Sequence, residues 1–226
     1  MTTHQAIQPT TTLAELAVTL PGASRVFHRH GLDFCCGGRV PLAQACEKKG
    51  LDPQAVLGEL QDEQKREDTP AHMAQAPLQQ LIGYILERFH EGHRAELPRL
   101  LEMATKVERV HGEKPTCPTG LAKELERVVE NMESHLQKEE QVLFPLILAG
   151  RGALTGMPIS VMEQEHQDHG QSLARLRALT HDYTPPAEAC NTWQALYLGL
   201  AEFESELMEH IHLENNSVFP RALSGE

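Results

Sequence analysis

The segment of the sequence that decides the fold is residues 121–145, which read LAKELERVVENMESHLQKEEQVLFP. Seven of its residues recur at steps of four and three: Leu121, Leu125, Val128, Met132, His135, Glu139 and Val142. Such steps place side chains on one face of an α-helix. Residues 196–220 repeat the pattern with Leu196, Leu200, Phe203, Leu207, His210, Glu214 and Ser217, and both segments end in Phe-Pro. Each segment is therefore predicted to form a helix whose apolar face carries one His and one Glu, a turn apart.

Two further segments repeat each other in the same way. One helix face is shared by Leu86, His90, His93, Leu97 and Leu100, and another by Met162, His166, His169, Leu173 and Leu176. We expect four helices, over residues 77–108, 119–145, 159–181 and 188–219, separated by connections that contain Pro or Gly. The prediction is an all-α fold in which residues 77–226 form an antiparallel four-helix bundle, built from two copies of a two-helix unit.

Residues 1–60 are predicted to form a separate small helical domain. Helical patterns cover residues 12–18, 42–49 and 53–60, and Pro and Gly residues interrupt them. The polar stretch QDEQKREDTPAHMAQA, residues 61–76, contains a proline and is predicted to be a linker between the two domains.

At one depth of the predicted bundle, polar side chains replace the apolar ones on all four helices. Two buried carboxylates would repel each other, so this belt needs a positive partner, which divalent metal ions provide. The expected ligands are four imidazoles and two carboxylates: His90, His135, Glu139, His166, His210 and Glu214. Six protein ligands exceed the four of a tetrahedral zinc site but suit two metal ions that share carboxylate bridges. Mixed nitrogen and oxygen ligands fit iron, with manganese, cobalt or zinc as substitutes in vitro.

The order of residues in the motif separates two classes of two-metal bundle. Carboxylate-rich, ferritin-like bundles carry Glu-x-x-His, whereas this chain carries His-x-x-x-Glu twice. The His-Glu-x-x-His motif of zinc proteases is also missing, because the stretch from His90 to His93 is one residue too short.

The remaining histidines are weaker candidates. His93 and His169 are expected to support the ligands or to line the site, and ligation by either one is the alternative. His111 is predicted to lie in a loop. Five others are predicted to be solvated: His28, His30, His72, His181 and His212.

Composition excludes several classes of function. The 226-residue chain has 32 acidic and 20 basic residues, a formal charge of −12, which argues against a nucleic-acid partner. No apolar run of membrane-spanning length occurs, and the polar N-terminus does not read as a secretory signal. Five sparse cysteines do not suggest a disulfide scaffold, so a reducing compartment is expected.

Cys35 and Cys36 are the candidate catalytic residues of the N-terminal domain. Thiolates are soft ligands that can receive iron or exchange electrons, and the adjacent Gly37 and Gly38 would let a partner approach closely. A pair of ordinary thiols, or two thiols joined by oxidation, is the alternative. The other cysteines, Cys46, Cys117 and Cys190, are expected to be packing or surface thiols.

These motifs resemble those of hemerythrin-like domains, and the whole chain resembles the RIC (repair of iron centres) family. The resemblance rests on the histidines and glutamates named above, on the N-terminal stretch GLDFCCGG at residues 31–38, and on KVERVH, PISVME and LENN at residues 106–111, 158–163 and 213–216. It implies a centre of two non-haem iron ions, bridged by oxo and carboxylate groups. It also implies repair of iron–sulfur clusters damaged by nitrosative or oxidative stress, by iron donation, by nitric oxide reduction, or by both. The implied partners are damaged iron–sulfur proteins, nitric oxide and an unidentified electron donor, and a homodimer is also considered.

Two other functions use the same ligands. A hemerythrin-like bundle can bind oxygen or nitric oxide reversibly, as a carrier or a sensor. The resemblance implies that oxygen-carrying hemerythrin-like proteins bind their metals with five histidines, one Glu and one Asp. This chain instead offers four strong histidines and two Glu. A plain iron store is the third hypothesis, and loading far above two irons per chain would distinguish it.

Overall fold

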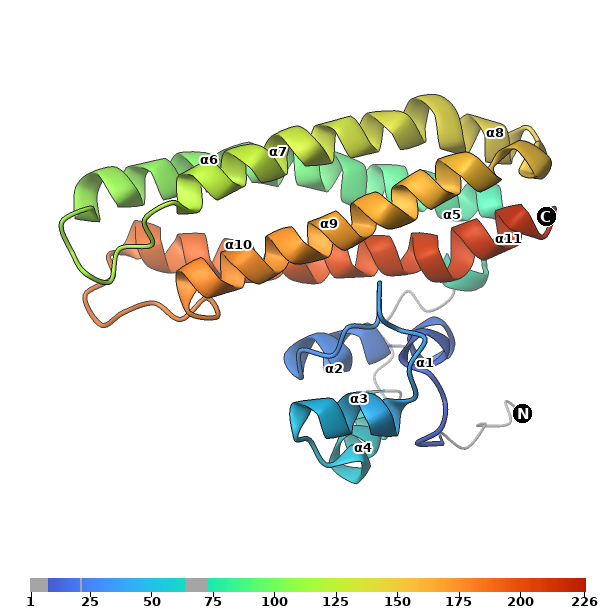
Figure 1. Ribbon diagram of the computed structural model, residues 1–226, viewed down its shortest axis with the longest axis horizontal. Helices are drawn as coiled ribbons and strands as arrows, with labels where there is room; N and C mark the ends of the chain where they lie inside the picture. The colour runs from blue at the N-terminus through green and yellow to red at the C-terminus, as the bar shows by residue number, and fades with distance from the viewer. Residues whose placement is uncertain (1–7, 21, 64–72) are drawn as a thin grey trace.

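The computed structural model describes residues 8–20, 22–63 and 73–226, and it is built from helices (Figure 1). A long bundle of four antiparallel helices lies above a small N-terminal group of short helices. Within the described ranges, the β-structure consists of one isolated bridge between Thr12 and Pro41. The predicted all-α bundle with a small helical N-terminal domain is confirmed.

Three of the four bundle helices contain a single π-helical turn. The first helix consists of α5 (Leu78–Ile85), η2 (Leu86–His90) and α6 (Glu91–His111); the second of α7 (Leu121–Lys138), η3 (Glu139–Leu143) and α8 (Phe144–Leu148). The third is α9 (Gly156–Thr180), preceded by the short 3₁₀ helix η4 (Gly152–Leu154), and the fourth consists of α10 (Asn191–Leu213), η5 (Glu214–Val218) and α11 (Phe219–Leu223). Each helix begins and ends within a few residues of its predicted range.

The two Phe-Pro pairs explain where two of the π turns lie. Proline has no N–H to donate to the fourth carbonyl before it, so the α-helical ladder is already interrupted at Pro145 and Pro220. The N–H of Phe144 instead reaches back five residues to the carbonyl of Glu139, and the N–H of Phe219 to that of Glu214. Each π turn therefore begins at one of the two predicted carboxylate ligands.

One predicted core position is wrong because of these turns. Val142 is 48% exposed, whereas the next residue, Leu143, is 1% exposed. The π turn adds one residue to the helix. The apolar face therefore continues at Leu143, the fourth residue after Glu139, instead of at Val142, the third. In the other repeat Ser217 and Val218 are both buried.

This change of register can be tested by removing side chains on either side of it. Replacing Leu143 by alanine is expected to lower the free energy of unfolding by about 2–5 kcal/mol, the cost of a large cavity in a core. Replacing Val142 by alanine should change it by no more than about 0.5 kcal/mol. Chemical denaturation of both variants measures the difference, and equal losses would contradict the assigned register.

The polar belt divides the apolar interior of the bundle into two clusters. One cluster, toward the connection between α6 and α7, includes Leu100, Leu125, Met132, Leu200 and the fully buried Trp193. The other, toward α8 and α11, includes Ile85, Phe144, Ile147 and Phe219. The ligand positions thus lie in a section of the bundle closed off by apolar side chains along the axis in both directions.

The N-terminal group has a core of its own. It contains α1 (Leu13–Thr19), α2 (Ala23–Arg29), α3 (Leu42–Lys49) and α4 (Pro53–Glu63), which bury side chains such as Phe27, Leu42 and Leu60. The sequence pattern did not predict α2. This helix starts at Ala23, directly after Gly22, whose positive φ of 76° is one that glycine adopts readily. The helix α4 runs three residues beyond its predicted end. Most of the predicted linker, residues 64–72, lies outside the described residues, and η1 (Met73–Gln75) follows it.

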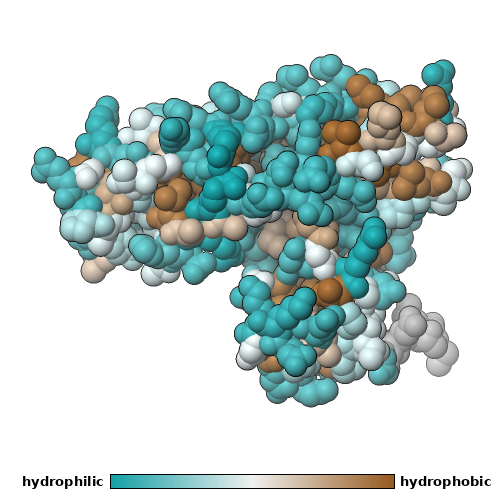
Figure 2. Space-filling model, viewed as in Figure 1, coloured by the Kyte–Doolittle hydropathy of each residue, from teal (hydrophilic) through white to brown (hydrophobic). Residues whose placement is uncertain are grey.

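Most of the face seen in Figure 2 is hydrophilic, and hydrophobic residues gather on it at the end of the bundle that α8 and α11 form. Exposed apolar side chains in α8, η4, the first turn of α9 and α11 are Leu148, Leu154, Met157 and Leu223. Within residues 8–20, 22–63 and 73–226, no helix combines the length and the apolar character that crossing a membrane requires.

Candidate metal centre

The structure brings the six predicted ligands together at one depth of the bundle. They form two groups, in each of which the potential ligand atoms lie within 4.8 Å of one another: His90, Glu139, His210 and Glu214 in group 1, and His135, Glu139, His166 and Glu214 in group 2. All six side chains are buried, and Glu139 and Glu214 belong to both groups. The arrangement provides each group with two imidazoles and two shared carboxylates.

Distances within the groups are those of ligands gathered around a common point. Glu139 Oε2 lies 3.4 Å from His90 Nε2 and 3.5 Å from His135 Nε2. Glu214 lies 3.1 Å from the Nε2 atoms of both His166 and His210. One residue from each bundle helix thus contributes an imidazole, and the two π turns place the carboxylates between them.

Buried atoms without partners support a cation in this space. Both carboxylate oxygens of Glu139 and the Nε2 atom of His90 are buried and have no hydrogen-bond partner. The Nε2 atoms of His135 and His166 face each other at 3.3 Å, while their Nδ1 atoms bond elsewhere. Two bare ring nitrogens cannot bond to each other, so this geometry fits a positive ion between them.

The electrostatics of the belt lead to the same conclusion. Burial and the neighbouring charge of Glu214 raise the pKa of Glu139 well above its usual range. Burial opposes ionisation of Glu214 as well, but His210 and His166 outweigh it and hold the pKa of Glu214 well below its usual range. Burial, followed by the nearby His210, lowers the pKa of His90 to about 4, and burial also lowers the pKa of His135. Near neutral pH these two imidazoles are therefore uncharged, the form that binds metal ions.

Three polar side chains that the sequence pattern did not identify hold the ligand rings in place. His90 Nδ1 donates to Glu140 at 2.8 Å, His135 Nδ1 donates to Glu165 at 3.0 Å, and His166 Nδ1 bonds to Asn215 at 2.8 Å. A carboxylate only accepts, so the first two bonds leave Nε2 as the free ligand atom. Each partner directly precedes or follows a predicted ligand in sequence, which is the signal that could have identified it.

Positive charges in turn hold the two carboxylate partners. Arg94 lies 2.6 Å from Glu140, and Lys138 lies 2.5 Å from Glu165. The hydrogen bond from His135, together with Lys138, lowers the pKa of Glu165 to about 2. Glu165 therefore stays ionised across the physiological pH range and remains the hydrogen-bond acceptor for His135 Nδ1.

His93 and His169 are buried next to the ligand groups but belong to neither. The ring of His93 lies 5.4 Å from that of His210, and the ring of His169 lies 4.9 Å from that of His135. Both line the centre, one beside each group, and the Nε2 atom of each has no hydrogen-bond partner.

A matched pair of histidine variants tests this assignment. His90→Gln should lose the ion of group 1, because it removes one of two imidazoles there, while His93→Gln should retain both ions. Metal analysis of the two purified variants, each loaded anaerobically with ferrous iron, measures the difference. Equal metal loss from both variants would place His93 among the ligands.

Two predictions about other histidines are wrong. His212 is 2% exposed, because it lies on the outer face of α10 that the N-terminal group covers, with its ring 5.4 Å from that of Phe34. His111 is the last residue of α6, not part of a loop, and its ring nitrogen lies 3.2 Å from the Cys190 sulfur. His28 and His30 are half-buried, His181 is exposed, and His72 lies outside the described residues.

The two adjacent thiols lie beside group 2. Cys35 is buried, Cys36 is half-buried, and their sulfur atoms are 3.7 Å apart. The sulfur of Cys36 is 3.6 Å from the backbone carbonyl oxygen of His166. The hydrogen bond to Cys36, burial and the charge of Asp33 all raise the pKa of the Cys35 thiol well above its usual value.

The thiols open onto a surface hollow of about 250 Å³. It is lined by Cys35, Cys36, Gly38, Arg39, Glu163, Gln167, Asn215 and Asn216. Together with Asp33, the two sulfurs form a third set of potential ligands within 4.8 Å of one another. The structure therefore puts the thiols at the edge of the metal centre and gives them access to solvent. All five cysteines are free thiols, and Cys46 is buried in the N-terminal core.

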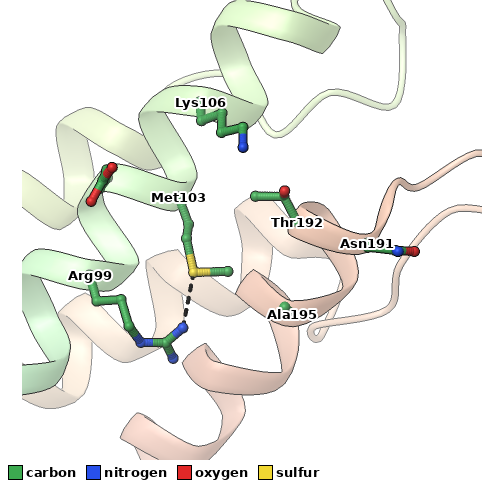
Figure 3. A pocket seen from close by; sticks show the side chains of 7 residues that line it. Arg99, Met103, Lys106, Asn191, Thr192 and Ala195 are labelled. Carbon is green, nitrogen blue, oxygen red and sulfur yellow. Dashed lines mark hydrogen bonds between the residues drawn. The ribbon is translucent and has the colours of Figure 1, made fainter.

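A larger hollow elsewhere on the bundle has no such chemistry. It has a volume of about 410 Å³ and lies between α6 and the start of α10 (Figure 3). Its lining consists of Arg99, Glu102, Met103, Lys106, Asn191, Thr192 and Ala195. Arg99 donates a hydrogen bond to the sulfur of Met103, one turn further along α6. Its lining contains neither His nor Cys, and Glu102 is its one carboxylate.

Comparison with known families agrees with this fold and site. Residues 81–222 match the family described as the hemerythrin HHE cation binding domain. Residues 9–64 match a second family, ScdA_N, described as a domain of unknown function. The bundle is therefore a hemerythrin-type cation-binding domain, as the resemblance in the sequence implied.

Relatives that are similar over nearly the full length of the chain show more specifically which family it belongs to. A protein of Yersinia pseudotuberculosis serotype IB, named iron-sulfur cluster repair protein YtfE, is 51% identical over 214 residues, which cover 95% of this chain and 97% of the relative. A protein of the same name from Dickeya chrysanthemi is 50% identical over the same shares of both chains. The chain belongs to this YtfE family, and in it a hemerythrin domain follows an ScdA_N domain along the sequence of this protein.

Proposed function

We propose that the protein repairs iron–sulfur clusters damaged by nitrosative or oxidative stress, with a non-haem di-iron centre held by the six ligands. The observation that carries the proposal is the pair of buried ligand groups that share Glu139 and Glu214. Two ions a few ångströms apart are the arrangement that shared carboxylates produce. The names of the YtfE relatives supply the link to cluster repair.

Iron is the metal that the ligand set favours. Two imidazoles and two carboxylates per ion form a mixed set of nitrogen and oxygen donors, without the sulfur ligands typical of structural zinc sites. Fewer protein ligands than an octahedral ion accepts leave positions for an oxo bridge or a small molecule. When bound, two ferrous ions would supply iron for donation, and the two electrons that, with two protons, convert two molecules of nitric oxide to nitrous oxide and water.

The residues around the centre have separate tasks in this proposal. Glu140 and Glu165 hold the Nδ1 protons of two ligand histidines, so that the Nε2 atoms face the ions. The apolar clusters above and below the belt keep bulk water from the ligands along the bundle axis. Cys35 and Cys36, beside group 2, would receive iron or nitric oxide at the solvent edge.

The position of His93 and His169 favours repair over oxygen carriage. Both lie outside the two ligand groups, so the set remains four imidazoles and two glutamates. A reducing cytoplasm is the expected compartment, because it keeps both thiols available. Damaged iron–sulfur proteins, nitric oxide, an electron donor and a second copy of the chain remain the expected partners.

The proposal is tested with iron-loaded, reduced protein under anaerobic conditions. The protein is offered nitric oxide in one assay and an apo cluster protein with sulfide in another. We expect nitrous oxide in the first assay, cluster reconstitution in the second, or both. Neither product, from protein shown to hold two irons, would contradict the proposal.

A cysteine double variant tests the role of the thiols in the same assays. Cys35→Ser/Cys36→Ser should keep both irons, because neither sulfur belongs to the two buried ligand groups, and should lose most of the iron transfer. The matched control is Cys46→Ser, a change at a thiol remote from the centre in the N-terminal core. Iron transfer at the wild-type rate in the double variant would remove the thiols from the mechanism.

A further inference from the structure

One side chain connects a predicted metal ligand to the thiol-bearing loop of the other domain. Asn215 follows Glu214 in the π turn η5, and its side-chain oxygen lies 2.8 Å from His166 Nδ1. Its side-chain nitrogen donates to the backbone carbonyl of Cys35 at 3.0 Å. The sulfur of Cys36 makes a second contact with the bundle, at the backbone carbonyl of His166 in α9.

The chemistry of these groups fixes the direction of each hydrogen bond. A backbone carbonyl only accepts, so the amide nitrogen of Asn215 must face Cys35 and its amide oxygen must face His166. An amide oxygen also only accepts, so His166 must carry its proton on Nδ1. In the neutral ring, the form that binds metal ions, the Nε2 atom of His166 is then bare, and it lies 3.1 Å from Glu214 inside group 2. The Cys35 carbonyl thus determines, through Asn215, which nitrogen of His166 can bind metal.

The other three ligand histidines have no such connection. His90 and His135 are held by carboxylates of the bundle itself, Glu140 and Glu165. The Nδ1 atom of His210 is buried without a hydrogen-bond partner. Within the part of the chain that the structure describes, His166 is therefore the one ligand imidazole oriented through the N-terminal domain, and it belongs to group 2 only.

We propose that Asn215 is a positioning residue that couples metal binding at group 2 to docking of the Cys35–Cys36 loop on the bundle. The coupling rests on the proposed two-metal centre. A docked loop holds His166 ready for the ion, and by thermodynamic linkage the bound ion holds the loop in its docked position. Displacing the loop weakens the ion that lies beside the thiols and leaves the group 1 ion unchanged. The centre therefore has one tightly held ion and one whose release depends on the N-terminal domain.

The first experiment measures Cys35 in the wild-type protein. Each cysteine is alkylated anaerobically with iodoacetamide, with and without two equivalents of ferrous iron, and modification is followed residue by residue by mass spectrometry. We expect iron to slow alkylation of Cys35 about 10-fold, the lower end of the effect that ligand-supporting partners have on metal affinity. Cys190, which is exposed, and Cys46, which is buried in the N-terminal core, serve as internal controls and should not respond.

Two substitutions at Asn215 separate its hydrogen bond with His166 from its hydrogen bond to the Cys35 carbonyl. Asn215→Asp keeps an acceptor for His166 Nδ1 but cannot donate to the Cys35 carbonyl. Both ions should stay bound, while Cys35 becomes reactive and no longer responds to iron. Asn215→Leu removes both hydrogen bonds. One of its two ions should leave about 10–100-fold faster in a chelator competition, and the other should leave at the wild-type rate.

The outcomes distinguish this coupling from its alternatives. Wild-type protein that binds two irons without any change at Cys35 would overturn the coupling and leave the proposed function intact. Wild-type protein that binds fewer than two would overturn both. Protection of Cys35 by iron that persists in Asn215→Leu would assign the effect to direct binding at Asp33, Cys35 and Cys36, and would also overturn the coupling. If Asn215→Leu does not fold, Asn215→Asp makes the same distinction, because direct binding would still protect Cys35 in that variant.

Discussion

Replacing Glu139 by glutamine will reduce the metal content of the protein from about two ions per chain to less than one. Glu139 belongs to both ligand groups, so its loss removes a ligand from both ions at once. The affinity for ferrous iron should fall by at least about 100-fold, beyond the 10–100-fold typical of partners that only support a ligand. Anaerobic titration followed by metal analysis measures both quantities.

The neighbouring residue provides the control for this prediction. Glu140→Gln makes the same chemical change one position along the helix, at a side chain that supports His90 but belongs to neither group. It should weaken only the group 1 ion, by about 10–100-fold. The metal-free Glu139→Gln protein should also be more stable than metal-free wild type near neutral pH. Without metal, the buried Glu139 must take up a proton or stay charged beside Glu214, and glutamine avoids both costs. Similar metal loss in the two variants would contradict the shared role of Glu139.

Removing the metal from the wild-type protein will lower its melting temperature by about 15–30 °C. Each ion held at a concentration 1,000 times its dissociation constant stabilises the fold by about 4 kcal/mol. Two ions together contribute about 8 kcal/mol, and for a chain of this length each kcal/mol corresponds to about 2–4 °C. Calorimetry of the iron-loaded and chelator-treated protein measures the shift.

The part of the protein that loses stability when the metal is removed can be identified as well. Backbone amides of η3 and η5 should lose protection from hydrogen exchange first, because these turns carry the two shared carboxylates. Glu139→Gln should show little change in melting temperature when chelator is added. A shift below about 3 °C in the wild-type protein would mean that the belt is stable without ions, contrary to the electrostatics of Glu139 and Glu214.

Helix faces and ligand spacing could be predicted because they are local properties of the sequence. His135 and Glu139 are four residues apart, and this spacing places them on one face of any α-helix. The repeat of the pattern at His210 and Glu214 made a shared site the simplest explanation. The all-α fold, the four bundle helices and the meeting of the six candidate ligands follow from this periodicity.

What could not be predicted depends on local irregularity or on contacts between segments distant in sequence. The π turn after Glu139 adds a residue to the helix, which exposes Val142 and buries Leu143. Periodicity assumes a regular helix and cannot detect such a turn, although the Phe-Pro pair marks its place. The burial of His212 required knowledge of where the N-terminal domain docks. The contact of Asn215 with Cys35 joins residues 180 positions apart, beyond the reach of any local pattern.

The most direct test of the account is anomalous diffraction at the iron edge from crystals of the anaerobically loaded protein. Two peaks about 3.5–4 Å apart are predicted at the level of the belt. One should lie about 2.0–2.2 Å from the Nε2 atoms of His90 and His210, the other at the same distance from those of His135 and His166, with Glu139 and Glu214 contacting both. A single peak, or peaks only beside Cys35 and Cys36, would contradict the central claim that four helices hold a shared pair of ions.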